Sequence, residues 1–452
     1  MTEHPDPDSV EVRALKPGEV EITIPELLAF AIRLHRDERL DEAEKCYRSL
    51  LQFEPGNANA LHFLGVLEHQ RGNDAKALEL VRKSIDMDPS VASWHNNLGN
   101  VLLRHDQFDD AVRAYARCVE LDPGNLAACN NLGLLLRKLD RPVESEEMLK
   151  HVVAVDPKFG DAHTNLARLY TSLGRMPEAF SHFADALALK PADNRIRRLM
   201  AVAYASAGRM ADGLKTCREW VALAPDDAMA QHFLAAFGGA EVPQRASDAY
   251  VEQEFDGFAR TFDAQLAALG YRAPEWVLEA VAHVAGEPRR QWSILDVGCG
   301  TGLCGPLLQP YANAMAGVDL SAKMLDLARP RAVYDRLVKA ELVAFLDQRD
   351  DVYDLVVSAD TLCYFGRLEE AFAGVMGVLR TGGYWVFTVE AHPEEQAFKL
   401  QAHGRYSHSR DYIESALFST GFRQITLREV ELRFESGKPV AGWLVCARAD
   451  GT

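Results

Sequence analysis

The sequence predicts an all-α array of helical repeats followed by an α/β domain with a mainly parallel sheet. Prolines recur every 34 residues in the first half of the chain. In the second half, short apolar runs alternate with helical segments, which indicates βα units. Three glycines at alternate positions follow the first of these runs. At 452 residues the chain is too long for a single core, so two or three domains are expected.

The repeat in the first half is marked by six prolines in register. They are Pro55, Pro89, Pro123, Pro157, Pro191 and Pro225. A period of 34 residues is typical of the tetratricopeptide repeat, a helix-turn-helix unit. Small residues recur where the two helices of a repeat approach closely, at Gly65, Gly99, Gly133, Ala167 and Ala201. We therefore expect an all-α solenoid over residues 22–240, with six repeats and a capping helix at 228–237.

The segments around the array have distinct compositions. Residues 1–21 are acidic, contain proline and lack an apolar core, so we expect a disordered leader and neither a signal peptide nor a membrane anchor. Gly238, Gly239 and Pro243 mark a linker at 241–249. The α/β domain is expected over residues 250–452.

A row of asparagines indicates a function for the array. Asn97, Asn131 and Asn165 occupy the same position in the first helices of three consecutive repeats, which line the inner wall of such a solenoid. An amide offers both a donor and an acceptor to an extended peptide. The row resembles the asparagine ladder of O-linked N-acetylglucosamine transferase, which implies that a polypeptide binds in the groove. Asparagines bonded only within the array, or an array that serves dimerisation, are the alternatives.

The glycine-rich segment predicts a nucleotide site. An apolar run ends at Asp296, and Gly298, Gly300 and Gly302 follow it. Glycine is needed where backbone approaches a ligand or adopts positive φ, and open α/β sheets bind nucleotides at the carboxyl ends of their strands. A dinucleotide fingerprint requires a third glycine three residues after the second, and this position is Leu303.

The pattern from Asp296 to Gly302 resembles the first motif of class I S-adenosylmethionine-dependent methyltransferases. Asp319, at the end of the second apolar run, matches the acid that accepts the ribose hydroxyls. With the repeats, the chain is similar to bacterial predicted methyltransferases that carry N-terminal tetratricopeptide repeats. The resemblance implies a Rossmann-like sheet of seven strands whose last strand is antiparallel. Two β-rich runs, 422–434 and 439–447, would supply the closing hairpin.

The same resemblance implies S-adenosylmethionine as the cofactor and a set of residues around it. Met324 matches the apolar side chain on the adenine face, and a strand near 337–342 would place residues beside the adenine edge. A phenylalanine-rich helix at 250–269 would form a lid over the cofactor; the alternative is a helix that buries its phenylalanines against the sheet or the repeats. The expected cofactor-binding residues are Asp296, Gly298, Cys299, Gly300, Thr301, Gly302, Asp319, Leu320, Met324, Ala340, Glu341, Leu342 and Ser358.

Methyl transfer displaces a neutral thioether, so alignment and exclusion of water can supply most of the catalysis. A general base is needed only for a poorly acidic hydroxyl or a protonated amine. Positions able to serve are Asp360, Tyr364, Glu390, His392, Tyr406 and His408; we select Asp360, Tyr364, Tyr406 and His408 as the candidates and favour His408 because imidazole titrates near neutral pH. Alternatively, Ser407 or Ser409 caps a helix and His408 is incidental. Residues 358–361 lack the Asn/Asp-Pro-Pro-aromatic motif, which disfavours methylation of adenine N6 or glutamine.

Composition limits the partners. A net charge of −17 argues against nucleic acid as the main partner. The eight cysteines form no Cys-x-x-Cys pair and match no zinc spacing, so we expect reduced thiols, a cytoplasmic location and no metal site. No membrane partner is expected.

These observations predict a methyltransferase acting on oxygen or nitrogen of a substrate that is docked through, or presented by, the repeat groove, with a polypeptide favoured. One alternative is a small-molecule methyltransferase whose repeats serve only assembly into an oligomer. The other is a non-catalytic adaptor. A protein that uses this fold without binding a cofactor would not require glycine at 298, 300 and 302, which argues against the adaptor.

Overall fold

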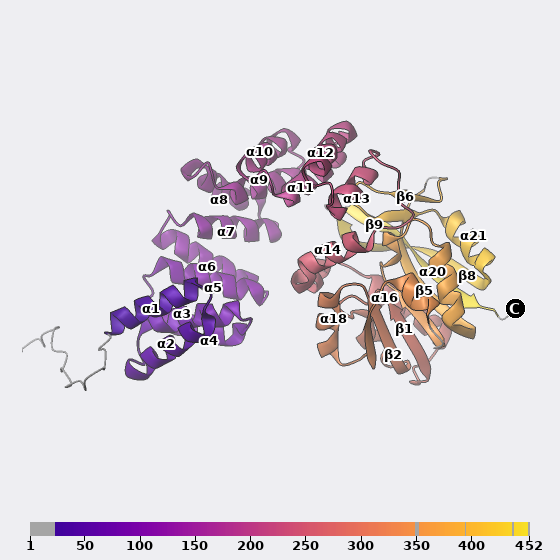
Figure 1. The fold of residues 1–452 in the computed structure, drawn as a ribbon, viewed down its shortest axis with the longest axis horizontal. Helices are drawn as coiled ribbons and strands as arrows, with labels where there is room; N and C mark the ends of the chain where they lie inside the picture. The colour runs from indigo at the N-terminus through magenta and orange to yellow at the C-terminus, as the bar shows by residue number, and fades with distance from the viewer. Residues whose placement is uncertain (1–22, 349–351, 394, 436–437, 451–452) are drawn as a thin grey trace, which may run out of the picture. The chain divides into compact units, whose positions relative to one another are not determined.

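The computed structural model describes residues 23–348, 352–393, 395–435 and 438–450 (Figure 1). The chain forms two compact units, one ending at Leu169 and the other beginning at Tyr170. The expected leader at 1–21 lies outside the described residues. The boundary between the units falls inside a repeat helix instead of at 241–249, so the last repeats group with the α/β domain.

Paired helices form the repeats, and a single helix follows them. The pairs are α1 (Ile24–Arg36) with α2 (Leu40–Phe53), α3 (Ala58–Gln70) with α4 (Asp74–Met87), α5 (Ala92–Arg104) with α6 (Phe108–Leu121), α7 (Leu126–Lys138) with α8 (Pro142–Val155), α9 (Gly160–Ser172) with α10 (Met176–Leu189), and α11 (Asn194–Ser206) with α12 (Met210–Leu223), and α13 (Ala228–Ala236) follows. The predicted all-α repeat architecture is confirmed.

The recurring small residues have the expected cause. A Cβ on Gly65 would lie 2.7 Å from Cγ2 of Val81, and a Cβ on Gly99 would lie 2.5 Å from the ring of Tyr115. Such contacts are closer than van der Waals distance, so only glycine lets the two helices of the repeat approach this closely.

The α/β domain contains one sheet of nine strands within the described residues. The strands are β1 (Trp292–Val297), β2 (Ala312–Asp319), β3 (Arg336–Lys339), β4 (Tyr353–Ser358), β5 (Leu379–Ala391), β6 (Phe398–Leu400), β7 (Tyr406–His408), β8 (Phe422–Glu435) and β9 (Lys438–Ala449). Strands β3-β2-β1-β4-β5 are parallel neighbours in that order. Strand β9 runs antiparallel to β5 and pairs with β8, as expected for the closing hairpin. Two strands beyond the expected seven, β6 and β7, have three residues each and are too short to show an alternating pattern.

Helices cover both faces of this sheet. They are α14 (Asp248–Phe258), α15 (Phe262–Ala268), α16 (Ala273–Ala285), α17 (Cys304–Leu308), α18 (Ala322–Ala328), α19 (Leu342–Asp347), α20 (Glu369–Val378) and α21 (Arg410–Thr420), with 3-10 turns η1 (Ala259–Thr261), η2 (Arg329–Arg331) and η3 (Leu362–Tyr364). Trp385 and Val386 are neighbours on β5 and point to opposite faces. Trp385 shares a core with Phe372 of α20, and Val386 shares another with Val277 of α16. In the described part of the chain, every helix is too short or too polar to cross a bilayer.

The capping helix α13 packs against the α/β domain. Phe233 of α13 shares a core with Tyr250 of α14 and with Leu400 and Tyr406 of the short strands. The Nε2 of His232 lies 2.8 Å from the carbonyl oxygen of Gly404, and the His232 ring stacks on Tyr250 at 3.8 Å. The helix that was expected only to cover the last repeat therefore also covers one end of the sheet.

Candidate active site

In the glycine loop after β1, two glycines pack against side chains of the protein and one faces open space. Gly298, Gly300 and Gly302 have φ values of +70°, +55° and +83°, which L-residues rarely adopt. A Cβ on Gly298 would lie 2.0 Å from Oγ1 of Thr361, and one on Gly302 would lie 2.9 Å from the Tyr334 ring. A Cβ on Gly300 would meet nothing nearer than Phe262 at 3.8 Å. Gly300 is therefore the glycine that faces open space.

The carboxylate of Asp319, at the end of β2, is oriented by backbone amides. Gly300 donates its N–H to Oδ2 and Ser321 donates its N–H to Oδ1, both at 2.8 Å. Burial raises the pKa of Asp319 and these amides oppose the rise. The backbone N–H of Leu320 also bonds this carboxylate, and its remaining acceptor capacity can bind a ribose hydroxyl.

Asp296 lies deeper, at the end of β1. It is almost fully buried, and its Oδ2 accepts a hydrogen bond of 2.6 Å from the hydroxyl of Tyr334. Burial raises the pKa of Asp296 to about 7, although the Tyr334 hydrogen bond acts in the opposite direction.

Glu341 brings an unpaired acceptor to the same region. Its Oε2 caps α19 by accepting from the N–H of Ala344 at 2.8 Å. Its Oε1 is buried and has no hydrogen-bond partner, although it forms an ion pair with Nη1 of Arg245 at 3.7 Å. Because Glu341 caps a helix, the strand expected near 337–342 ends earlier, at Lys339. The free oxygen could accept an amino group such as that of adenine.

These groups line one cavity of about 340 Å³. The expected cofactor-binding residues that line it are Asp296, Gly298, Cys299, Gly300, Thr301, Asp319, Leu320, Ala340, Glu341 and Leu342. Gly302, Met324 and Ser358 are not among the lining residues. Gly302 packs on Tyr334, while Met324 and Ser358 are fully buried in the protein. The structure therefore does not place these three residues in contact with a ligand of this cavity.

The segment expected to form a lid also lines the cavity. The rings of Phe255, Phe258 and Phe262 contact one another with centroids 5.7–5.9 Å apart. The expected continuous helix at 250–269 is interrupted by η1, so these rings come from both α14 and α15. Side-chain contacts tie the segment to the cofactor side: Ser321 donates to Asp256 at 2.6 Å, and Thr301 donates to Asp263 at 2.5 Å.

The four candidate catalytic residues separate into two pairs. Asp360 and Tyr364 line the cavity, whereas Tyr406 and His408 do not. The hydroxyl of Tyr406 donates to the carbonyl of Pro243 at 2.8 Å. His408 is fully buried with Nε2 3.1 Å from the carbonyl of Gly366, and burial lowers its pKa to about 4. His408, the favoured base, is therefore poorly placed to take a proton from a substrate in this cavity.

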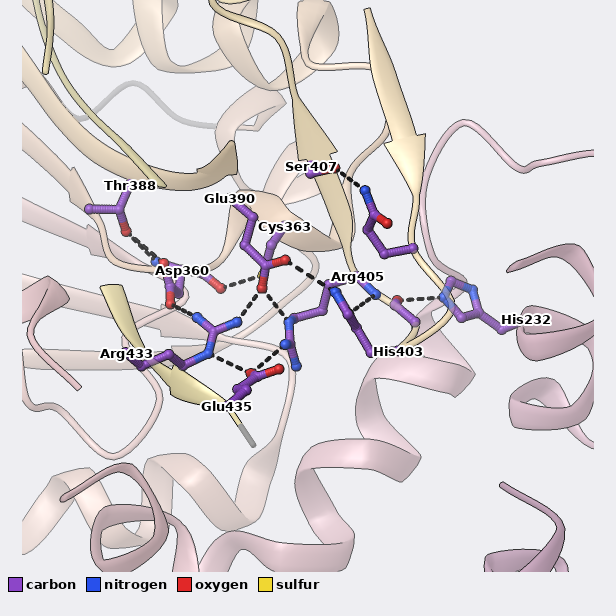
Figure 2. A network of polar contacts seen from close by, with 12 residues as sticks. His232, Asp360, Cys363, Thr388, Glu390, His403, Arg405, Ser407, Arg433 and Glu435 are labelled. Atoms are coloured by element: carbon purple, nitrogen blue, oxygen red, sulfur yellow. Dashed lines mark hydrogen bonds and ion pairs between the residues drawn. The ribbon is translucent and has the colours of Figure 1, made fainter. Parts of the chain in front are cut away.

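A network of charged side chains borders the cavity on the side of Asp360 (Figure 2), and the sequence analysis did not predict that they meet. Arg433 donates to Asp360 and to Glu435 at 2.7 Å each, and it also contacts Glu390. Arg405 donates to Glu390 and to Glu435 at 2.5 Å each. These side chains come from the β4 loop, β5, the β6–β7 turn and β8, so no local motif could have brought them together.

Burial and charge compete within this network. Burial opposes ionisation of Glu390, but Arg405 and Arg433 outweigh it and lower its pKa to about 2. Burial raises the pKa of Asp360, and Arg433 counteracts only part of this. Asp360 also has a left-handed backbone with φ of +53°, and its Oδ1 accepts a hydrogen bond of 2.8 Å from Thr388. Uncommon backbone geometry of this kind often occurs at functional sites.

The asparagine row lies within the unit that ends at Leu169, and its amide nitrogens have partners in the array. The Nδ2 of Asn97 lies 3.0 Å from Nε2 of His62. Asn131 donates to Asn100 at 3.2 Å and Asn165 donates to Asn130 at 2.9 Å. Binding of a polypeptide by this row stays a prediction, and it would use the amide oxygens more readily than the nitrogens.

Comparisons with known proteins agree with this architecture. Residues 295–387 match the family described as "Methyltransferase domain", and residues 28–92, 102–169 and 170–237 match tetratricopeptide-repeat families. A solved structure of Pseudomonas aeruginosa pilF is 17% identical, with a TM-score of 0.42, over 47% of this chain and 96% of that one.

Two curated relatives match the second half of the chain. The Malonyl-[acyl-carrier protein] O-methyltransferase of Geobacter sulfurreducens is 31% identical over 39% of this chain and 70% of its own length. The Probable S-adenosylmethionine-dependent methyltransferase CRG1 of Saccharomyces cerevisiae is 30% identical over 27% of this chain, and the match spans less than half of that protein, 44%. Together with the sheet order and the repeats, these matches show that the chain belongs to the class I S-adenosylmethionine-dependent methyltransferases and carries a tetratricopeptide-repeat array before the catalytic domain.

Proposed function

We propose that this protein transfers a methyl group from S-adenosylmethionine to an oxygen of a substrate in the cavity, and that the repeats bind the polypeptide that is, or carries, this substrate. The observation that carries the proposal is that Gly300, Asp319 and Glu341 line the same cavity as Asp360, Arg405 and Arg433.

The cofactor end fits an adenosyl group by its hydrogen-bonding capacity. Asp319 lines the cavity with acceptor capacity left for a ribose hydroxyl, and Oε1 of Glu341 is a buried acceptor without a hydrogen-bond partner that could bind the adenine amino group. Gly300 offers backbone without a side chain between these acids and the lid. When bound, the cofactor supplies an activated methyl group, and the phenylalanines of the lid exclude water from it.

The substrate end favours an acceptor that needs no general base. Asp360 lines the cavity, but its carboxylate is held by the Thr388 hydroxyl and by an ion pair with Arg433, which would have to open before Asp360 could take a proton from a substrate. Burial raises the pKa of Tyr364 well above its usual value, so its hydroxyl stays protonated. A carboxylate is deprotonated at neutral pH and can attack without such help. We therefore favour O-methylation of a carboxylate over methylation of an amine.

The relatives provide a specific candidate for the substrate. Several are named for O-methylation of malonyl-[acyl-carrier protein], a carboxylate attached to a carrier polypeptide. An acyl group on a carrier would combine the two predictions, because the polypeptide docks on the repeats while its acyl group enters the cavity. All eight cysteines are free thiols, which agrees with the proposed cytoplasmic location.

Two measurements test the proposal. Isothermal titration calorimetry should detect S-adenosylmethionine binding to the full chain, and lack of binding at millimolar cofactor would remove its basis. Transfer of radiolabelled methyl from the cofactor should be observed with malonyl-[acyl-carrier protein] and should be absent with acetyl-[acyl-carrier protein]. Equal rates with free malonyl-pantetheine and with the carrier-bound group would favour the alternative in which the repeats serve only assembly.

A further inference from the structure

One side chain of the repeat array reaches the methyltransferase cavity. Arg198 lies on α11, the first helix of the sixth repeat, and lines the same cavity as the glycine loop. It forms an ion pair with Glu254 of α14, and its Nη1 lies 3.3 Å from Sδ of Met229 in α13. His232 of α13 lies within hydrogen-bond distance of the Gly404 carbonyl and stacks on Tyr250. These contacts fix the end of the repeat array, which carries Arg198, against the catalytic domain.

Arg198 retains most of its hydrogen-bonding capacity. A guanidinium has five N–H donors, and Glu254 and Met229 contact only Nη1. Its Nε and Nη2 have no partner among the described residues, and this edge of the guanidinium is the fork that binds a carboxylate through two parallel hydrogen bonds.

The neighbouring charged groups point to the same kind of ligand. Arg405 also lines the cavity and retains an unpaired Nη1, because its other bonds use Nε and Nη2. Both oxygens of Asp360, in contrast, already accept hydrogen bonds. The free capacity at this end of the cavity therefore includes arginine donors, which suit a group rich in acceptor atoms.

We propose that Arg198, contributed by the last repeat, is a specificity-determining residue that binds a carboxylate of the substrate, and that Glu254 holds its guanidinium at the cavity wall. The proposal rests on the proposed function only in taking this cavity as the substrate site. It gives the repeat array a direct part in substrate selection, in addition to any docking of a carrier.

The test compares two probes that differ only in a carboxylate. Malonyl-pantetheine and acetyl-pantetheine are titrated into the full chain saturated with S-adenosylhomocysteine, and affinities are measured by calorimetry. Wild type should bind the malonyl probe at least about 10-fold more tightly, as expected for a charge-assisted hydrogen-bonded pair. Arg198→Gln should remove most of this preference. Arg195→Gln, on the same helix and exposed, should preserve it.

Glu254→Gln separates recognition from a purely structural ion pair. Glutamine at this position can still accept a hydrogen bond from Arg198 and hold its guanidinium, so if Arg198 binds the substrate, the preference for the malonyl probe should be maintained. If the pair only stabilises the fold, both substitutions should lower Tm alike and leave the preference unchanged, which would overturn the proposal. Equal binding of the two probes by wild type would also overturn it. Failure of S-adenosylhomocysteine to bind would instead count against the proposed function itself.

Discussion

At the scale of single residues, the three loop glycines have different functions although they form one motif. All have positive φ, but only Gly300 faces open space, whereas Gly298 and Gly302 adjoin Thr361 and Tyr334. The sequence analysis predicted that all three glycines are needed because the backbone lies close to a ligand. The structure supports this for Gly300, while the other two accommodate side chains of the protein.

Substitution of two of these glycines by alanine should therefore have different effects. Gly300→Ala should cost about 1–2 kcal/mol of stability from left-handed backbone and should weaken S-adenosylmethionine binding. Gly298→Ala carries the same strain and also forces Thr361 to move, which should add about 1–3 kcal/mol. Thermal denaturation without cofactor, followed by calorimetry with it, measures both effects. Equal losses of stability for the two variants would contradict this assignment.

Asp319 allows a direct test of the cofactor site. Asp319→Asn should weaken binding of S-adenosylmethionine by about 10-fold or more, because it removes a charged acceptor. Burial disfavours the charge of Asp319, but asparagine has one acceptor oxygen and leaves the N–H of Gly300 or Ser321 without its partner, so the two effects oppose each other and the Tm of the cofactor-free variant should change little. The exposed Asp326→Asn is the matched control. A variant with unchanged affinity would refute the assignment of Asp319 to the cofactor.

Asp296 predicts a dependence of stability on pH. Its pKa is about 7 in the folded protein, above the ordinary value of 3.8, so the fold binds this proton more tightly than the unfolded chain does. The resulting stabilisation, at most about 4 kcal/mol, is complete below pH 4 and is lost as the pH rises through 7. Asp296→Asn should therefore lose less Tm than wild type between pH 5 and 8. Parallel Tm profiles for the two proteins would show that Asp296 does not titrate in this range.

At the scale of elements, most of the fold could be predicted because its signals are local and periodic. Prolines and small residues repeat along the array, and a glycine loop and hairpin mark the sheet. The charged network could not be predicted, because Asp360, Glu390, Arg405 and Arg433 meet only through the order of the strands. His408 looked like a base from its residue type, yet pairing of β7 with β5 and β6 buries it.

The first helices of the repeats allow a test of the asparagine row. Replacement of Asn97, Asn131 and Asn165 by alanine in the full chain removes their amide contacts in the array, each worth about 0.5–1.5 kcal/mol, so Tm should fall. If the amide oxygens also bind a polypeptide, the variant should lose binding on a peptide array. Asn313→Ala, in the α/β domain, is the control. A variant that melts earlier but binds peptides normally would limit the row to a structural role.

At the scale of the whole molecule, the repeat array and the catalytic domain do not separate at the predicted linker. Residues 241–249 interact closely with the catalytic domain: the N–H of Ala246 donates to the carbonyl of Tyr364 at 2.8 Å, and Arg245 lines the cavity. The core formed by Phe233, Tyr250 and Tyr406 joins α13 to this domain. The last repeats therefore form one compact unit with the catalytic domain.

Two shortened chains should show this dependence. Residues 176–452 keep α10–α13 and should melt within a few degrees of the transition of the catalytic unit in the full chain. Residues 241–452 lack α13, so Tyr250, Leu400 and Tyr406 become more exposed to solvent. Each large side chain that is exposed should lower the free energy of unfolding by about 1.5–3 kcal/mol. A loss of several kcal/mol in the free energy of unfolding should lower Tm by about 10 °C or more in a domain of this size. Calorimetric melting and S-adenosylmethionine titration of both fragments measure the effect. If residues 241–452 melt and bind cofactor like residues 176–452, the last repeats would be dispensable for the catalytic unit, and Arg198 would have no fixed place in its cavity.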